Sequence, residues 1–192
     1  SLHSTAKGVS GECGQRGGYM ELVRFSPEVQ AVIFKLALIN LCSVVPGQAL
    51  MELMINPPKK GDPSFETYHR ETTTIHKDLQ DRADALYAAF TLMEDFSCNK
   101  PQGAMYLFPR LKFSEETYPE LFKESMESGN APDDLYCLKL LESTGICCVP
   151  GSGFGQVPGT YHLRTTFLPP GKEWVASWEK FHLKFVREYK IK

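Results

Sequence analysis

Residues 3–22, HSTAKGVSGECGQRGGYMEL, tell most about how this chain folds and what it can do. Lys7 is a lone ammonium among small residues, and glycines follow it. A lysine held in a partly desolvated site gives up its proton more readily, and the free amine can attack a carbonyl carbon. Arg16 offers a planar fork suited to phosphate oxygens, and the hydroxyls of Ser4 and Thr5 supply further donors. These residues predict a site for an aldehyde that carries a phosphate.

Simpler interpretations of the same residues stay open at this point. Most lysines are exposed, so Lys7 taken alone is a solvated loop residue. An arginine on a glycine-rich turn often caps carbonyls or pairs with a carboxylate, which would make Arg16 structural. Arg164 is a cation on an otherwise apolar strand, and by itself it also fits a structural role.

A family resemblance decides between these alternatives. The segment resembles the cofactor-lysine region of pyridoxal phosphate enzymes of the aspartate aminotransferase fold, with serine three residues before the lysine and arginine eight or nine after it. It is more similar still to the alanine aminotransferases, whose pattern reads nearly HSTSKG, then GECG, then RGGY. The likeness extends over essentially the whole chain, including PGQAL at 46–50, QGAMYLFPR at 102–110 and APDDLYCLKLLESTGICCVPGSGFGQVPGTYHLRTTFLPP at 131–170.

The resemblance implies a role for each of four residues. Lys7 would form a Schiff base with pyridoxal 5'-phosphate and then shuttle the proton of the substrate. Ser4 and Arg16 would bind the cofactor phosphate, and Arg164 would bind the substrate α-carboxylate. The implied reaction is L-alanine plus 2-oxoglutarate giving pyruvate plus L-glutamate by a ping-pong route. The alternatives are a related aminotransferase with another substrate, such as a glyoxylate-linked enzyme, and a non-catalytic dimerisation module.

The chain departs from the family pattern in two ways. Ala6 stands where the family usually has serine, which bears on phosphate affinity more than on the chemistry. Whole subunits of the family are more than twice as long, and the likeness covers their C-terminal portion. The family's aspartate for the pyridine nitrogen lies upstream of that portion. We therefore expect the chain alone to be inactive, and to act with the rest of its polypeptide in a homodimer on small amino acids and 2-oxo acids.

The predicted fold class is α/β, in three parts. Residues 1–62 are expected to end a large cofactor domain, residues 63–96 to form a long interdomain helix, and residues 97–192 to form a small α/β domain. Apolar side chains spaced by threes and fours predict the long helix, including Phe65, Tyr68, Thr72, Ile75, Leu79, Leu86, Phe90 and Met93. The alternative is a helix packed flat on a single core.

Other elements follow from local signals. Ser26 and Pro27 can begin a helix that runs to about residue 41 and is apolar on nearly every face, so we expect other structure to cover it. Strands are expected at 19–25, 104–111, 146–149 and 161–168, and further helices at 47–54, 132–144 and 172–189. The aromatic stripe of the last helix is expected in the core. By the likeness, the turn at 151–159 lies near Arg164, and residues 151–155 are expected to shape the entrance.

Composition and charge narrow the possible partners. A net charge of −2 gives no electrostatic footprint for nucleic acid. The longest apolar stretch, residues 31–42, is too short to cross a bilayer, so no membrane partner is expected. The six cysteines match no zinc spacing, and we predict no metal. Reduced thiols suit a reducing compartment, and the cytosol and the mitochondrion remain as alternatives.

Overall fold

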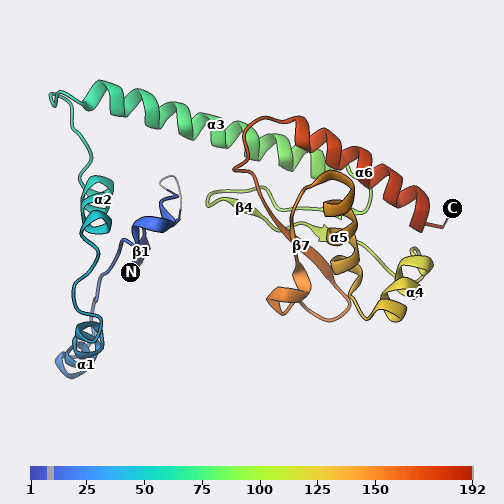
Figure 1. Ribbon diagram of the computed structural model, residues 1–192, viewed down its shortest axis with the longest axis horizontal. Coiled ribbons are helices and arrows are strands. Elements are labelled where there is room, and N and C mark those ends of the chain that lie inside the picture. The colour runs from blue at the N-terminus through green and yellow to red at the C-terminus, as the bar shows by residue number, and fades with distance from the viewer. Residues whose placement is uncertain (8–10, 192) are drawn as a thin grey trace. The chain divides into compact units, whose positions relative to one another are not determined.

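The computed structural model describes residues 1–7 and 11–191 (Figure 1). Contacts between Cα atoms divide the chain into two units, Ser1–His76 and Lys77–Lys192. The division falls inside the long helix α3 (Phe65–Leu92), which the sequence predicts over almost the same residues. The three-part domain division at residues 62 and 96 remains a prediction.

A short hairpin opens the first unit. Strand β1 (Leu2–Ser4) pairs antiparallel with β2 (Gly18–Met20), so that Ser4 lies opposite Gly18, and the 3-10 helix η1 (Cys13–Gln15) lies between the two strands. The predicted strand at 19–25 is too long, because the pairing with β1 ends at Met20. Glu21 still exchanges hydrogen bonds of 2.9 Å with Ser1, and residues 22–25 are not in a strand.

Two helices complete the first unit before α3 begins. Helix α1 (Pro27–Leu38) starts as predicted, with the Ser26 hydroxyl accepting from the Val29 N–H at 3.5 Å, and it ends three residues early. Most of its apolar side chains are exposed, Leu38 by 62%, and so is Ile39 just after it, by 73%. The expected covering of this helix therefore remains a prediction. Helix α2 is Val45–Ile55, close to the predicted 47–54. None of the helices within the described residues is long and apolar enough to span a membrane.

A five-stranded antiparallel sheet organises the second unit. Its longest strand, β7, pairs with β4, β5 and β6, and β3 pairs with β5. The strand order is β3-β5-β7-β4, with β6 also on β7. The strands are β3 (Phe96–Ser97), β4 (Tyr106–Leu107), β5 (Arg110–Leu111), β6 (Val149–Pro150) and β7 (Tyr161–Thr166). This arrangement places Arg164 in the middle of the sheet, opposite Val149 of β6.

The strand predicted at 104–111 is wrong as a single element. It divides at Pro109, whose nitrogen has no hydrogen to donate, into β4 and β5. The strand predicted at 146–149 begins only at Val149. Strand β3 and helix α4 (Pro119–Ser128) were not predicted, although α4 has a proline at its start and Gly129 in the left-handed conformation at its end.

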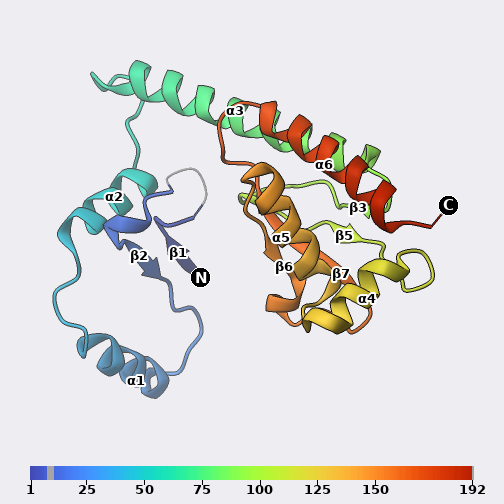
Figure 2. The same cartoon turned by 45° about the vertical axis from the view of Figure 1, so that its right-hand side comes forward.

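Helices α5 (Pro132–Thr144) and α6 (Glu173–Tyr189) pack with α3 over the sheet to form the core of this unit (Figure 2). The bounds of α5 match the prediction, since Pro132 opens the helix and Gly145 closes it in the left-handed conformation. The aromatic stripe of α6 is core, as predicted, with its buried members Trp178, Phe181, Phe185 and Tyr189. Trp178 meets Phe90 of α3 edge to face, with ring centroids 5.0 Å apart.

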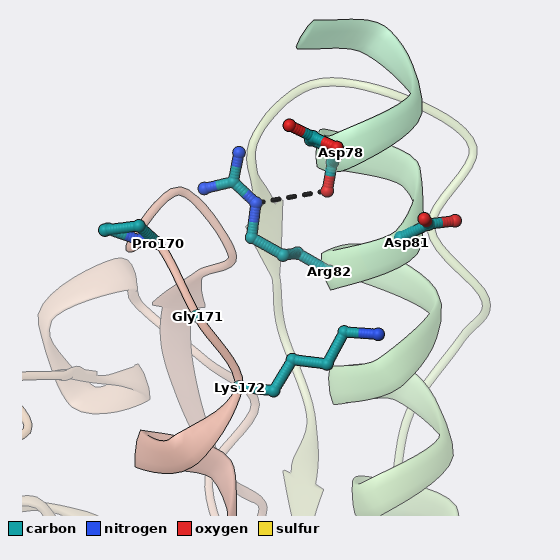
Figure 3. A pocket seen from close by; sticks show the side chains of 6 residues that line it. All are labelled: Asp78, Asp81, Arg82, Pro170, Gly171 and Lys172. Atoms are coloured by element: carbon teal, nitrogen blue, oxygen red, sulfur yellow. Dashed lines mark hydrogen bonds between the residues drawn. The ribbon is translucent and has the colours of Figure 1, made fainter. Parts of the chain in front are cut away.

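The turn after β7 is tied to α3 through Arg82. Figure 3 shows the bond of Arg82 to Asp78 within α3, with Pro170 and Gly171 of the turn lining the same hollow. The Nε of Arg82 donates to the carbonyl of Asp78 at 3.1 Å, and its Nη1 donates to the carbonyl of Leu168. Gly171 follows in the left-handed conformation that lets the chain turn into α6. The hollow at this turn holds two carboxylates and two cations from α3 and the turn, so its charges balance within the fold.

One buried polar network has a definite set of protons. The Nε2 of His182 lies 2.7 Å from the carbonyl oxygen of Glu94, which can only accept, so Nε2 carries the hydrogen. The Nδ1 of His182 then accepts from the Tyr136 hydroxyl at 3.1 Å, and that hydroxyl accepts from the Trp178 Nε1 at 3.0 Å. Burial lowers the pKa of His182 from its usual 6.5, although the carbonyl of Glu94 and the carboxylate of Asp95 act in the opposite direction.

We expect this histidine to make the protein less stable in mild acid. The pKa of His182 in the folded state lies below the unfolded value of 6.5. The stability that the neutral ring contributes is therefore fully present above pH 6.5 and is lost as the pH falls through the folded-state pKa. Urea unfolding at pH 8 and pH 5 checks this against His182→Gln, which cannot titrate. The wild type should lose more stability between the two pH values than the variant does, and equal losses would contradict the assignment.

Candidate functional site

A buried threonine shapes the loop that carries Lys7. Thr5 is fully buried, its N–H donates to the carbonyl of Gly17 at 3.0 Å, and its carbonyl accepts from the N–H of Glu12 at 2.9 Å. Its hydroxyl lies 3.1 Å from the same Gly17 carbonyl and accepts from the Gly17 N–H at 3.3 Å. These bonds close the loop between β1 and β2 and leave Lys7 exposed. Sequence reasoning gave Thr5 only a phosphate contact and missed this role.

Two glycines let helix α2 approach the same loop. A Cβ on Gly17 would lie 2.5 Å from the carbonyl oxygen of Gly47, and a Cβ on Gly47 would lie closer still to the carbonyl oxygen of Gln15. Neither backbone atom can move as the end of a flexible side chain does. The first turn of α2 therefore buttresses the loop that places Lys7 and Arg16.

We expect Gly47→Ala to disturb this loop more than Gly14→Ala does. The added methyl group at Gly47 meets backbone and forces α2 and the loop apart, a change that costs roughly 1–3 kcal/mol in comparable packing. A Cβ at Gly14 meets nothing within 4 Å. Thermal unfolding and cofactor titration of the full-length protein should show lower stability and weaker cofactor binding for the first variant alone. Equal behaviour of the two variants would contradict the buttressing role.

Lys7 and Ser4 line a cavity of about 880 Å³ within the first unit. Its other walls are largely apolar and come from β1, α2 and the start of α3, namely Leu2, His3, Leu50, Leu53, Met54, Tyr68, Thr72, Ile75 and His76. The Ser4 oxygen accepts from the Ala6 N–H at 3.1 Å, which leaves the hydroxyl hydrogen for another acceptor. The structure thus brings together two of the residues that the sequence selects.

Arg16 belongs to the same loop but does not line this cavity. It closes η1 in the left-handed conformation with φ 53°, and its Nη1 donates to the carbonyl of Cys13 at 2.9 Å. A guanidinium has five N–H donors, so the others can serve a ligand. The phosphate-binding role of Arg16 remains a prediction.

The cavity has the features that pyridoxal phosphate would need. It offers an amine for an aldehyde at Lys7, a hydroxyl donor at Ser4, and apolar walls for an aromatic ring. The volume of about 880 Å³ is within the usual range for small-molecule pockets. These residues fit the cofactor that the resemblance implies.

Arg164 lies in the second unit, between two aromatic rings. Its guanidinium carbon is 4.6 Å from the ring centroid of Tyr106 on β4 and 4.8 Å from that of Phe154, which ends the 3-10 helix η2 (Gly151–Phe154). Cations over aromatic faces are attracted by the ring quadrupole. The two rings hold the plane of the guanidinium. Sequence reasoning names Arg164 and places the turn that contains Phe154 near it, but it identifies neither ring as a contact, because the two rings come from two other elements and leave no local spacing signal.

The residues that the structure describes contain no cluster of metal ligands. No group of three or more His, Cys, Asp or Glu side chains there could hold a metal ion. All six cysteines are free, and Cys13, Cys42 and Cys147 are exposed. Burial raises the pKa of the Cys98 thiol to about 11 and keeps it protonated.

Comparison with known proteins gives one family. The family model for aminotransferase class I and II matches residues 4–173. The mitochondrial alanine aminotransferase of Saccharomyces cerevisiae is 58% identical over 99% of this chain, and human alanine aminotransferase 1 is 47% identical over 98%. A Saccharomyces cerevisiae relative named inactive alanine aminotransferase is 53% identical over 99% of this chain. This chain spans 31%, 38% and 37% of the lengths of these three proteins.

Solved structures show the same fold. The alanine aminotransferase from Pyrococcus furiosus has a TM-score of 0.71 and 28% identity, covering 95% of this chain and 42% of its own. The aspartate aminotransferase from Rhizobium meliloti has a TM-score of 0.68 at 19% identity, covering 99% of this chain and 42% of its own. The α/β fold class predicted from the sequence is confirmed.

Proposed function

This chain belongs to the aminotransferase class I and II family, and we propose that it is the C-terminal part of a pyridoxal phosphate-dependent alanine aminotransferase. The whole enzyme would convert L-alanine and 2-oxoglutarate into pyruvate and L-glutamate. The observation that carries this proposal is that Lys7 and Ser4 line the same largely apolar cavity. Relatives named alanine aminotransferase at 58% and 47% identity support the choice of substrate.

Each proposed site residue has a task suited to its chemistry. Lys7 would hold the cofactor through its Nζ, and the same amine would take the proton from the substrate Cα. Ser4 and Arg16 donate hydrogen bonds to the phosphate. Arg164 grips the substrate α-carboxylate with two parallel N–H groups, which fixes the orientation of the Cα–H bond. When bound, pyridoxal phosphate supplies the electron sink that makes this proton acidic.

The proposal includes partners for the chain. The rest of the polypeptide would complete the cofactor site, since this chain spans only 31% to 38% of the relatives reported above. A homodimer would cover apolar side chains of α1 that are exposed in this chain, such as Phe34 at 54% and Leu36 at 60%. The cytosol and the mitochondrion are both proposed as possible compartments. The Saccharomyces cerevisiae relative with 58% identity is named as mitochondrial.

A second candidate is a folded module without catalysis. The relative named inactive alanine aminotransferase, 53% identical to this chain, shows that a sequence of this kind occurs in a protein described as inactive. Ala6, in place of the family's usual serine, is the feature of this chain that fits such a loss.

The test is an assay of the full-length protein loaded with pyridoxal phosphate. We expect pyruvate from L-alanine when 2-oxoglutarate is the acceptor, and a lower kcat/KM with glyoxylate as the acceptor. A higher kcat/KM with glyoxylate would assign the related glyoxylate-linked activity. A protein that binds the cofactor but transfers no amino group would support the second candidate.

A further inference from the structure

A buried carboxylate holds the loop that contacts Arg164. Asp133, the second residue of α5, is fully buried. One of its oxygens, Oδ2, accepts from the backbone N–H of Ser152 in η2 at 2.9 Å and from the Gln156 Nε2 just after η2 at 2.8 Å. Its other oxygen, Oδ1, is buried without a hydrogen-bond partner. Such a carboxylate is costly to bury, so its two bonds to one loop point to a specific role.

The chain of contacts continues from the loop to β7. Because Gln156 turns its NH₂ group to Asp133, its Oε1 faces His162 and accepts from Nδ1 at 3.0 Å. Gly151, the first residue of η2, is pressed against the same strand, since a Cβ there would lie 2.8 Å from the His162 Cβ. The loop is thereby held at both ends against the strand that carries Arg164.

Phe154 transmits this position to the guanidinium. Its ring lies 4.8 Å from the Arg164 carbon, and it meets the Phe108 ring edge to face with centroids 5.6 Å apart. An arginine side chain has many rotamers, and a fixed aromatic face reduces their number before a ligand binds. Without the bonds from Asp133, Phe154 would be free to move, and the guanidinium plane of Arg164 would no longer be fixed by its ring.

We propose that Asp133 is a positioning residue for the substrate carboxylate, acting through η2 and Phe154 on Arg164. The proposal rests on the proposed function, because it takes Arg164 as the group that binds the α-carboxylate. It makes Asp133 necessary for substrate affinity more than for the chemical step. Asp133 itself touches neither substrate nor cofactor in this account.

The test compares Asp133→Ala and Asp133→Asn in the full-length, cofactor-loaded enzyme. For Asp133→Ala we expect the KM for L-alanine to rise about tenfold while kcat changes by less than about threefold. Both loop bonds end on Oδ2, so the carbonyl of an asparagine can accept both while its NH₂ takes the place of Oδ1. Asp133→Asn should therefore restore most of the affinity.

Hydrogen exchange gives a readout that does not depend on activity. The amide of Ser152 should exchange faster in Asp133→Ala and close to the wild-type rate in Asp133→Asn. Thr144→Val is the matched control, because Thr144 lies at the other end of α5. Its hydroxyl donates to the carbonyl of Leu140 at 2.7 Å and accepts from the N–H of Ile146 at 3.1 Å. It should lower thermal stability and leave the KM unchanged.

The possible failures are distinguishable. A folded Asp133→Ala with wild-type KM, or with unchanged exchange at Ser152, would overturn the positioning role. If that variant does not fold, Gln156→Ala removes one of the two bonds and should raise the KM by a smaller factor; an unchanged KM there would also overturn it. A wild-type protein without any transamination would instead contradict the proposed function.

Discussion

Replacing Lys7 with alanine should lower the rate of transamination by at least about 10³-fold, because general acid–base catalysis by one positioned group is commonly worth 10²–10⁴-fold and the covalent link is lost as well. The absorbance of the bound cofactor should change in the same variant, since the amine that joins it is gone. Steady-state kinetics and an absorbance spectrum of the full-length protein measure both effects.

Lys60→Ala is the matched control for this prediction. Lys60 is an exposed lysine of the same unit, in the turn before α3, and it is not among the residues that line the cavity with Lys7. Its removal should change neither rate nor spectrum. Wild-type transamination by Lys7→Ala would remove Lys7 from the proposed role, and with it the function assigned to the cavity.

The second large effect is expected for Arg164→Leu. The kcat/KM for L-alanine should fall roughly 100-fold, because two charge-assisted hydrogen bonds to the carboxylate are lost and each is worth on the order of 1.5 kcal/mol or more. The loss should appear mainly as a higher KM, with the cofactor still bound. Arg164→Lys should recover only part of the affinity, because an ammonium cannot bind both oxygens in parallel.

A control within the same unit separates charge from position. Arg187 is exposed on α6, and Arg187→Leu removes an equal charge. Its KM for L-alanine should match the wild type. An unchanged KM in Arg164→Leu would mean that the stacking of Arg164 between Tyr106 and Phe154 serves the fold alone.

Much of the fold could be predicted because its signals are local. Pro132 and Gly145 mark the bounds of α5, and the spacing of apolar residues predicts α6 to within one residue at each end. The same spacing predicts the start of α3 to within two residues, whereas α3 ends four residues before the predicted residue 96. Pro109 is itself a local signal against a continuous strand, yet the apolar residues around it favour the prediction of one strand over 104–111 where the structure has β4 and β5. Helix α4 was missed although its Pro119 and Gly129 are ordinary boundary signals.

The site could be predicted only in part, because its supports are far apart in the sequence. The motif around Lys7 is local, and Ser4 lines the same cavity. The approach of Gly47 to Gln15 and the bonds from Asp133 to Ser152 and Gln156 join residues 19 or more positions apart. Such pairs have no fixed spacing, so they emerge only once the helices and strands are placed.

Lys7 is the residue proposed to hold the cofactor. The most direct measurement is borohydride reduction of the full-length protein loaded with pyridoxal phosphate, followed by peptide mapping. We expect the pyridoxyl label on the peptide that contains Lys7, and on the side chain of Lys7 itself. A label on any other lysine, with Lys7 unmodified, would contradict this role.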